Sequence, residues 1–330
     1  MPTTIPSIEL CNLRKTFGPR VAVEAFDLAI APGELVGFIG PNGAGKTTTI
    51  RMIMSIIFPD SGTISVLGRA SAVESKDRIG YLPEERGLYK KMKVGAFLEY
   101  MAHLKGVRSA GLSERVKTWL DRVGLGDCAK KRCEELSKGM QQKVQFITAV
   151  IHEPDLIILD EPFSGLDPVN SRVLRGLIDE QHRAGKTIIF STHQMSQAEA
   201  LCDRVVMIHQ GKKVLDDTPA AIRSKFDPRS VELEPGRANV AGLLADIAEV
   251  VSTSANNGSL RVELREGVDA AGMIPRLAMA TAARRIEVIR PTLEDVFIEI
   301  VEGTASETEK ELLRASLRAG GNSRSDKGGD

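Results

Sequence analysis

The sequence lacks a net charge. Its 330 residues include 44 lysines and arginines and 44 aspartates and glutamates, which cancel. Nucleic-acid-binding domains usually carry a basic face, and electrostatic membrane anchors need a cluster of basic residues. We therefore expect neither a nucleic-acid partner nor a polybasic membrane anchor.

Cysteines and long apolar runs are also scarce. The four cysteines form no Cys-x-x-Cys pair, which favours a reducing compartment over a disulfide framework. The opening residues MPTTIPSIEL lack the basic and apolar regions of a secretory signal. No apolar run approaches the roughly 20 residues that span a bilayer. If the protein acts at a membrane, we expect another chain to do the spanning.

The hydrophobic pattern predicts an α/β domain over residues 1–226. Short apolar runs such as ELVGFIG and LIILDEP are followed by helical patterns, which is typical of buried, mostly parallel strands. Two early segments, SIELCNLRKTF and VAVEAFDLAIAPGE, alternate more and predict an antiparallel flap. The strand signal disappears over residues 85–152, where we expect an inserted helical subdomain.

A smaller α+β domain is predicted over residues 227–303, after a linker at DPRS. Its pattern is strand, helix, strand, strand, helix, strand, followed by a last helix at TLEDVFIEIV, and this order is typical of a split β-α-β sandwich. Residues 304–330 end in AGGNSRSDKGGD, which has little to bury. We expect them to form a helical or disordered tail.

A glycine-rich segment after the apolar run LVGFI fits the phosphate-binding pattern G-x-x-x-x-G-K-[ST]. Its glycines let successive N–H groups face phosphate oxygens, and the following helix adds its positive end. Lys46 is expected to reach the β- and γ-phosphates and Thr47 to ligate Mg²⁺. The alternative is an ordinary glycine-rich turn. The residues expected around the nucleotide are Gly40, Pro41, Asn42, Gly43, Ala44, Gly45, Lys46, Thr47 and Thr48.

A second apolar run, LIILD, ends in a carboxylate. An unpaired charge at the end of a buried strand is costly, so we expect Asp160 to face the Mg²⁺ held by Thr47. Glu161 comes next and is the candidate general base for an attacking water. The alternative is an exposed acidic pair at a strand end.

His193 follows a third apolar run, in IIFSTHQ. It is a candidate to sense the γ-phosphate and to hold Glu161 and the water in line. The alternative is a structural histidine at a strand end. We assign no function to the other four histidines, His103, His152, His182 and His209.

The segment EELSKGMQQKVQF, residues 134–146, contains an unusual helix start. Ser137 is a good N-cap, Gly139 interrupts the first turn, and four polar residues follow. The cap and the free N–H groups after it make a second anion site. One nucleotide already has its phosphate loop, so we expect this second site to serve a nucleotide held by another copy.

The order GPNGAGKTT, LSKGMQQ, LIILDEP, SGLD and STH resembles the nucleotide-binding subunit of an ATP-binding-cassette (ABC) transporter. The resemblance implies the P-loop NTPase fold of an ABC cassette, with ATP as the nucleotide and Mg²⁺ as its metal. It also implies an ATPase that dimerises head to tail, with a homodimer expected. Such a dimer drives a separate transmembrane permease from the cytoplasmic face of the cell membrane.

The resemblance assigns further roles residue by residue. Ser137 and Gly139 match the signature loop that contacts the partner's γ-phosphate, and SGLD at 164–167 matches the loop that couples the two sites. Phe17 lies where the family has an aromatic ring that stacks on adenine; the alternative is a core residue of the flap. Glu84, in GYLPEERGLY, matches a position that links Mg²⁺ and water to the permease.

Three positions depart from the family pattern. Lys138 replaces the first signature glycine and Met140 replaces the signature glutamine, although a cation at 138 still suits a phosphate-facing helix start. Glu84 replaces a glutamine and adds a carboxylate near the metal, which it contacts directly or through water. Glu161 and His193 are both present, so we expect a competent site.

The C-terminal segment IRPTLEDVFIEIVEG resembles the appended domain of the type-2 export branch, which includes sodium-extruding and drug-exporting systems. This implies an exporter. A role for the appended domain in dimer stabilisation, in regulation or in stability alone stays open. The transported substrate cannot be predicted, because no residue of this chain is expected to touch it.

Three other functions are alternatives to the transporter. A soluble ABC ATPase acting on ribosomes or nucleic acid usually has two cassettes or long coiled coils, whereas this chain has one phosphate loop and no heptad run. A GTPase or kinase would leave LSKGMQQ and SGLD unexplained, and no NKxD motif occurs. A regulatory subunit with negligible turnover is disfavoured by Glu161, and a rate measurement decides it.

Overall fold

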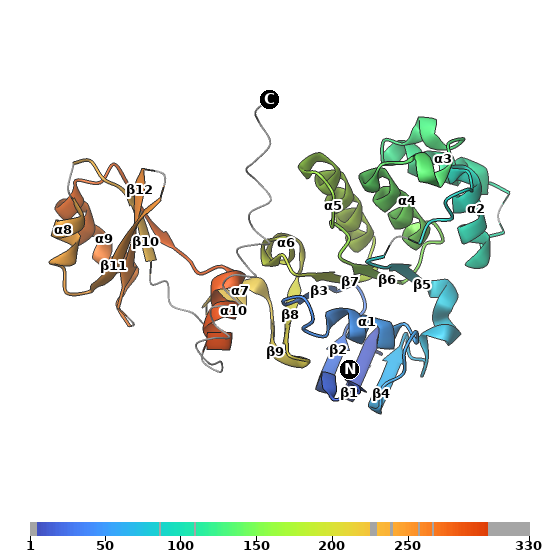
Figure 1. Cartoon of the computed structure of the whole chain (residues 1–330), viewed down its shortest axis with the longest axis horizontal. Helices are drawn as coiled ribbons and strands as arrows, with labels where there is room; N and C mark the ends of the chain where they lie inside the picture. The colour runs from blue at the N-terminus through green and yellow to red at the C-terminus, as the bar shows by residue number, and fades with distance from the viewer. Residues whose placement is uncertain are drawn as a thin grey trace. The chain divides into compact units, whose positions relative to one another are not determined.

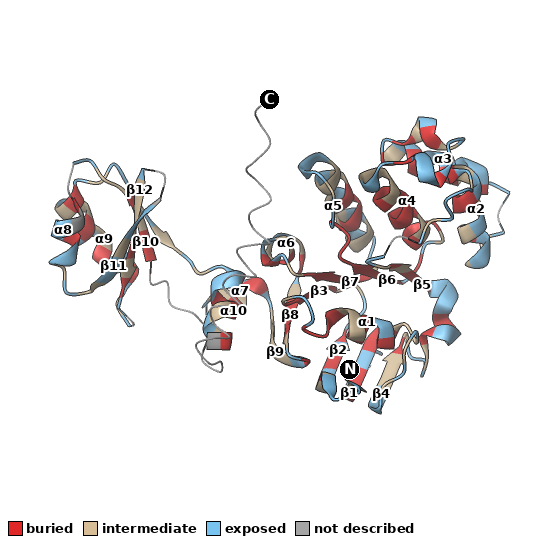
Figure 2. Ribbon diagram, in the orientation of Figure 1, coloured by how far each residue is buried: buried red, intermediate tan, exposed pale blue. Residues whose placement is uncertain are grey.

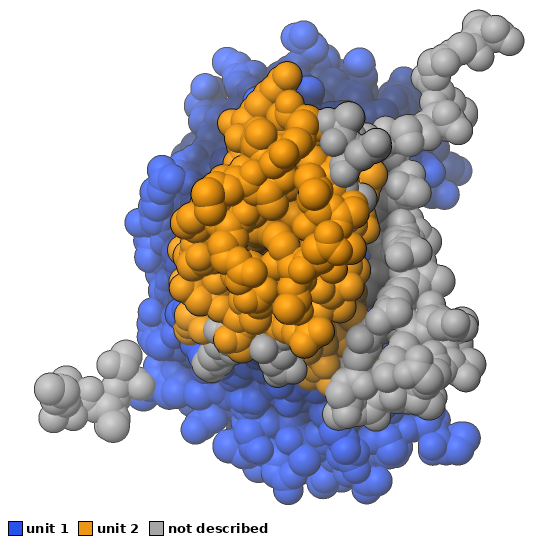
Figure 3. Space-filling view, turned by 90° about the vertical axis from the view of Figure 1, so that its left-hand side faces the viewer, with its two compact units in different colours: residues 1–218, 316–330 blue, residues 219–315 orange. Residues whose placement is uncertain are grey.

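The computed structural model describes residues 5–85, 87–108, 110–224, 230–237, 240–256, 258–265 and 267–302. They divide into two compact units, which separate between Thr218 and Pro219 (Figure 3). The predicted domain limit at residue 226, the tail after residue 303 and most of the linker DPRS lie outside the described residues. The domain limits given above therefore stay predictions.

The first unit is built on a six-stranded sheet with the order β5-β6-β7-β3-β8-β9 (Figure 1). All neighbours are parallel except β9, which runs antiparallel to β8. Every residue of β3, β6 and β7 is buried (Figure 2), as expected for strands covered on both faces. The strands are β3 (Leu35–Ile39), β5 (Ile79–Leu82), β6 (Leu156–Asp160), β7 (Thr187–Thr192), β8 (Arg204–His209) and β9 (Lys212–Asp217).

The register of this sheet brings three chain segments to one edge. Ile39 pairs with Thr192, and Asp160 pairs with Ser191. Because the carboxyl ends of parallel strands meet at the same edge, the residues that follow β3, β6 and β7 converge there. These are the phosphate loop, Glu161 and His193.

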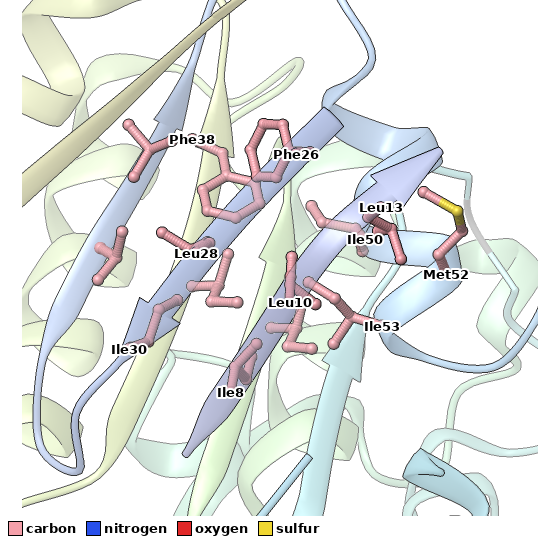
Figure 4. Close-up of a cluster of buried hydrophobic side chains, with 14 of the residues drawn as sticks. Ile8, Leu10, Leu13, Phe26, Leu28, Ile30, Phe38, Ile50, Met52 and Ile53 are labelled. Atoms are coloured by element: carbon pink, nitrogen blue, oxygen red, sulfur yellow. The ribbon is translucent and has the colours of Figure 1, made fainter. Parts of the chain in front are cut away.

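The predicted flap is a three-stranded antiparallel sheet with the order β2-β1-β4. It consists of β1 (Ile8–Phe17), β2 (Arg20–Ile30) and β4 (Ser61–Val66). Its apolar face packs against helix α1 (Lys46–Ile53) and the central sheet. The side chains of this core in Figure 4 include Ile8, Leu10, Leu13, Phe26, Leu28, Ile30, Phe38, Ile50, Met52 and Ile53. This packing fixes the flap beside the helix that follows the phosphate loop.

The helices of the first unit cover the central sheet. Figure 1 shows α5 (Pro168–Arg183) and α6 (Met195–Leu201) on one face and α1 on the other. Helix α5 begins as its sequence predicts: Pro168 is its first residue, and the Asp167 carboxylate accepts the Asn170 N–H at 2.8 Å. A short 3₁₀ helix, η1 (Ala72–Arg78), leads into β5.

The inserted helical subdomain is confirmed, because the described residues between 85 and 152 contain helices and no strand. They are α2 (Val94–Leu104), α3 (Leu112–Arg122) and α4 (Lys138–Val150), with 3₁₀ turns η2 (Gly126–Cys128) and η3 (Cys133–Glu135). Trp119 of α3 packs edge-on against Phe146 of α4, with ring centroids 6.4 Å apart. Helix α4 also packs on β5, which connects the subdomain to the central sheet.

From residue 230 onward, the second unit has the predicted strand and helix order. Its antiparallel sheet has the order β11-β12-β10-β13, and helices α8 and α9 pack on each other. Their apolar side chains form a separate core around Leu233, Leu244 and Leu277. The elements are α7 (Pro219–Ser224), β10 (Ser230–Glu234), α8 (Val240–Ala245), β11 (Val250–Asn256), β12 (Ser259–Leu264), α9 (Ala270–Thr281), β13 (Arg285–Ile289) and α10 (Leu293–Glu302).

Two glycine substitutions test the packing around the phosphate loop. Gly40 has φ 148°, and a Cβ there would lie 2.1 Å from the carbonyl oxygen of Ile208. Gly40→Ala is therefore expected to lower the free energy of unfolding by about 2–4 kcal/mol. Gly176, exposed on α5 with no atom near its would-be Cβ, is the control. Gly176→Ala should raise the free energy of unfolding by about 1 kcal/mol. Urea unfolding measures both variants. Equal changes in the two variants would contradict the close approach of Ile208 to Gly40.

Candidate functional site: a nucleotide-binding cleft

The phosphate loop occupies the turn between β3 and α1. Gly43 and Gly45 have φ of 79° and 114°, which other residues adopt only with strain. A Cβ on Gly45 would lie 2.6 Å from the carbonyl oxygen of Ala22 in β2. The glycines are thus required by the tight turn and by the closeness of the flap. The first N–H groups of α1 follow directly, which suits phosphate binding.

Lys46 is buried at the start of α1. Its Nζ donates hydrogen bonds to the carbonyl oxygens of Gly40, at 2.7 Å, and Pro41, at 3.1 Å. Burial lowers the pKa of Lys46, and the nearby carboxylates of Glu161, Asp160 and Glu84 oppose that shift. The ammonium group is therefore held across the phosphate loop by backbone carbonyls.

Asp160 is fully buried at the end of β6. Its Oδ1 accepts hydrogen bonds from the hydroxyls of Ser191 and Thr47, the latter at 3.4 Å. Its Oδ2 has no hydrogen-bond partner among the described residues. Burial raises the pKa of Asp160. A buried carboxylate with one unpartnered oxygen beside the Thr47 hydroxyl fits a divalent cation, which would compensate the buried charge.

The donor set fits Mg²⁺ better than a metal that is fully enclosed by protein ligands. No group of three or more His, Cys, Asp or Glu side chains in the described part of the chain is arranged to hold a metal ion. Mg²⁺ is typically held by one or two carboxylates together with waters and substrate phosphates. Thr47 and Glu84 line one cleft, and Asp160 accepts a hydrogen bond from Thr47. The three side chains therefore suit that mode of Mg²⁺ binding.

Glu161 and His193 form a hydrogen-bonded pair. Glu161 Oε1 accepts two bonds from His193, one from the backbone N–H and one from Nδ1, each at 2.9 Å. The Glu161 backbone has φ 49°, which is unusual for a residue with a side chain, and its N–H bonds to Ser191. Asp160 and Glu161 are both buried, so the alternative of an exposed acidic pair is wrong.

The hydrogen bond with Glu161 raises the pKa of His193 above its ordinary value of 6.5. The imidazolium therefore stabilises the fold below pH 6.5, and this contribution is lost as the pH rises through the pKa of His193.

In Glu161→Gln the pKa of His193 should fall back toward its ordinary value, because the negatively charged acceptor of its hydrogen bond is removed. An NMR titration of the ring protons measures the shift. His152, whose pKa burial lowers to about 4, is the internal control and should not move.

A cleft of about 450 Å³ opens between the flap and the phosphate loop, within the size range of small-molecule sites. It brings Phe17, the phosphate loop, Glu84 and Glu161 together, although they are far apart in sequence. Phe17 is 50% exposed, so it is not a core residue of the flap. The lining residues are Phe17, Arg20, Ala22, Asn42, Gly43, Gly45, Lys46, Thr47, Thr48, Glu84 and Glu161.

The other predicted site residues do not line the cleft. Gly40, Pro41 and Ala44 belong to the same loop, while Asp160 and His193 adjoin the cleft through their bonds to Thr47 and Glu161.

Ser137 and Gly139 are also absent from the cleft lining. Ser137 is exposed and caps α4, its Oγ accepting the Met140 N–H at 3.3 Å. A Cβ on Gly139 would make only an ordinary contact, 3.4 Å from Leu166. Packing within this chain therefore does not require a glycine at 139.

Two residues of the cleft carry no recognisable motif and were missed by sequence reasoning. Arg20 and Ala22 begin β2, and the Arg20 Nη2 donates to the Gly43 carbonyl at 3.0 Å. Their place at the site follows from the packing of the flap on the phosphate loop. No local pattern in the sequence could have revealed it.

Comparisons with known proteins identify the family. A family model described as ABC transporter matches residues 23–164. The uncharacterized ABC transporter ATP-binding protein YhaQ of Bacillus subtilis (strain 168) is 39% identical over 297 residues, covering 88% of this chain and 97% of the relative. The chain belongs to the ABC transporter ATP-binding proteins.

Further similarities within this family extend over both units. A model of the C-terminal domain of DrrA1-3-like ATP-binding proteins matches residues 218–301. The Nod factor export ATP-binding protein I of Paraburkholderia xenovorans (strain LB400) is 32% identical and covers 89% of this chain and 96% of the relative. A solved ATP-binding subunit of an ABC transporter superimposes with TM-score 0.62 at 33% identity, covering 66% of this chain and 92% of that chain.

Family membership confirms the predicted ABC cassette, ATP binding and ATPase activity. ABC ATP-binding subunits of transporters work with a transmembrane permease, as predicted. In the described ranges, no helix is long and apolar enough to cross a membrane.

Proposed function

We propose that this chain is the ATP-hydrolysing subunit of an export-type ABC transporter, acting as a head-to-tail homodimer with Mg²⁺ on the cytoplasmic face of the cell membrane. The proposed hydrolysis rests on one observation, the pair of hydrogen bonds from His193 to one oxygen of Glu161. Export is supported by the similarity to the Nod factor export ATP-binding protein I of Paraburkholderia xenovorans.

Glu161 is the general base in this proposal. Both bonds from His193 go to Oε1, which fixes the plane of the carboxylate and leaves Oε2 to accept a proton from the attacking water. His193 is a positioning residue for Glu161. Attack on the γ-phosphorus breaks the bond to the bridging oxygen, and ADP and phosphate leave. Such reactions depend mainly on positioning and charge stabilisation.

The rest of the cleft binds and orients ATP. The N–H groups of the phosphate loop and Lys46 hold the β- and γ-phosphates, and Phe17 stacks on adenine. Thr47, Asp160 and Glu84 would hold Mg²⁺. When bound, Mg²⁺ neutralises charge that develops on the phosphate oxygens.

The start of α4 completes the site of a second copy. Ser137 and Lys138 are exposed, and Gly139 leaves the backbone accessible at the positive end of a 13-residue helix. An exposed capped start with an added cation suits the γ-phosphate of a nucleotide held by the other subunit. Two identical sites result from the two-fold arrangement.

The permease is proposed to dock on α2 and the segment before it. Tyr89, Tyr100 and Leu104 expose apolar surface there, with 50%, 41% and 55% exposed. The rings of Tyr89 and Tyr100 lie 5.9 Å apart and form one aromatic patch. Tyr89 follows Glu84 closely in the chain. Exposed aromatic clusters are typical of interaction sites.

A pull-down tests this function. The tagged Glu161→Gln chain is recovered with ATP from native membranes in mild detergent, and its partners are identified by mass spectrometry. A polytopic membrane protein in stoichiometric amount is expected, and it should be lost in Tyr100→Asp but kept in the exposed control Arg172→Asp of α5. Ribosomal proteins or nucleic acid without a membrane chain would contradict the proposal.

A further inference from the structure

Two glutamines are among the buried residues of α4, although glutamine is mostly exposed in proteins. Gln142 is 2% exposed and Gln145 is 4% exposed, and the buried Lys143 and Val144 lie between them. Gln142 Nε2 donates to the carbonyl oxygen of Pro162 at 3.0 Å. Gln145 Nε2 donates to the carbonyl oxygen of Glu85 at 3.3 Å. The Gln142 amide therefore connects α4 to the loop after β6, outside the helical subdomain. The Gln145 amide connects α4 to the loop after β5, at the start of the subdomain.

The two accepting carbonyls belong to residues that directly follow cleft residues in the chain. Pro162 follows Glu161, the proposed base, and Glu85 follows Glu84, which lines the cleft. One rigid helix is thus hydrogen-bonded to both loops. Gln142 lies five residues from Ser137, about 7.5 Å along the helix axis. A shift of the helix would therefore displace the donors of both hydrogen bonds.

Stability alone does not account for a glutamine at 145. Its Oε1 is buried and finds no partner in the described part of the chain. A buried polar atom without a partner costs about 1–3 kcal/mol, which an apolar side chain would avoid. The neighbouring buried positions Phe146 and Ile147 are apolar. The amide at 145 is therefore better explained by its bond to Glu85.

We propose that Gln142 and Gln145 are positioning residues that transmit occupation of the α4 start to the loops of Glu161 and Glu84. When the second copy's nucleotide binds Ser137, α4 shifts and the two amides draw both loops into their working positions. Each site thereby senses the other subunit's nucleotide. This inference rests on the proposed function of Glu161 and Ser137.

Methionine substitutions test the link, because methionine keeps the length of glutamine and removes its N–H donor. Gln142→Met is expected to lower kcat by about tenfold, as small misplacements of catalytic groups do, with a smaller loss in Gln145→Met. The affinity for a non-hydrolysable ATP analogue, measured by fluorescence, should stay unchanged. The Hill coefficient for ATP should fall toward 1 in both variants.

Gln181 of α5 provides the control for the same chemical change. It is half-buried and does not line the cleft. Gln181→Met should keep the wild-type kcat and Hill coefficient. If Gln142→Met and Gln145→Met change kcat no more than this control, or lower affinity and kcat together, the inference is overturned.

Two further measurements keep the test decisive. If Gln142→Met fails to fold, Gln145→Met carries the test, because its bond is longer and its Oε1 is already unpartnered. Glu161→Gln separates the two claims. Full turnover in Glu161→Gln would refute the proposed base, whereas an inactive Glu161→Gln with normal glutamine variants would refute only the link.

Discussion

Glu161→Gln is expected to lower ATP turnover by about 10²- to 10⁴-fold while ATP still binds. The amide cannot accept the proton of the attacking water, but it is the same size as the carboxylate. His193 can still donate its backbone N–H to the side-chain oxygen, so the loop should keep its conformation. The phosphate loop and Lys46 are unchanged, which explains why binding should persist.

Phosphate release by the purified chain measures this effect, and fluorescence of a nucleotide analogue measures binding. Glu153→Gln is the control, because it makes the same chemical change in a side chain that is 72% exposed and pairs only at the surface with Arg115. It should turn over ATP at the wild-type rate. Wild-type turnover in Glu161→Gln would exclude this residue as the general base.

Lys46→Ala is expected to weaken ATP binding by about 10- to 100-fold, because a charge-assisted hydrogen bond to phosphate is lost. The lysine ammonium is buried beside the cleft and held by two carbonyls of the phosphate loop. Alanine removes the positive charge and also releases those carbonyls. The remaining N–H groups of the loop should still give weak binding.

Lys143→Ala is the matched control for that experiment. Lys143 is also buried, burial also lowers its pKa, and its Nζ donates to a backbone carbonyl, that of Val123 at 2.7 Å. It lies in the helical subdomain and does not line the cleft. The control should lose stability without losing affinity. Equal nucleotide affinities in Lys46→Ala and wild type would refute the assigned role of Lys46.

The sequence predicts those parts of the site that depend on short-range chemistry. The phosphate loop needs glycines at positive φ within eight residues, and that requirement is visible as a motif from Gly40 to Thr47. Asp160 stands out because a carboxylate ends an apolar strand. His193 and Glu161 follow neighbouring strands, and the β6–β7 register brings them together.

The remaining parts depend on contacts between distant segments. The order β5-β6-β7-β3-β8-β9 places β3 between strands that come much later in the chain, and no local pattern encodes that pairing. Arg20 reaches Gly43 because the flap packs on the phosphate loop. Ser191 holds Asp160 only because β6 and β7 are neighbours.

The polar run in α4 illustrates the same limit. From the sequence, Gln142 and Gln145 form part of an amphipathic helix with an unusual start. In the structure they are buried and bond to carbonyls of two loops, Pro162 and Glu85. Their role could not be predicted, because the acceptors are backbone atoms, which no side-chain pattern reveals.

The most direct test of the shared site is sedimentation velocity of the Glu161→Gln chain with ATP and Mg²⁺. We expect a dimer that reverts to monomer when ATP is removed, and that fails to form in the double variant carrying Ser137→Arg. A chain that binds ATP with normal affinity yet stays monomeric at every protein concentration would contradict the proposal that two copies share each nucleotide.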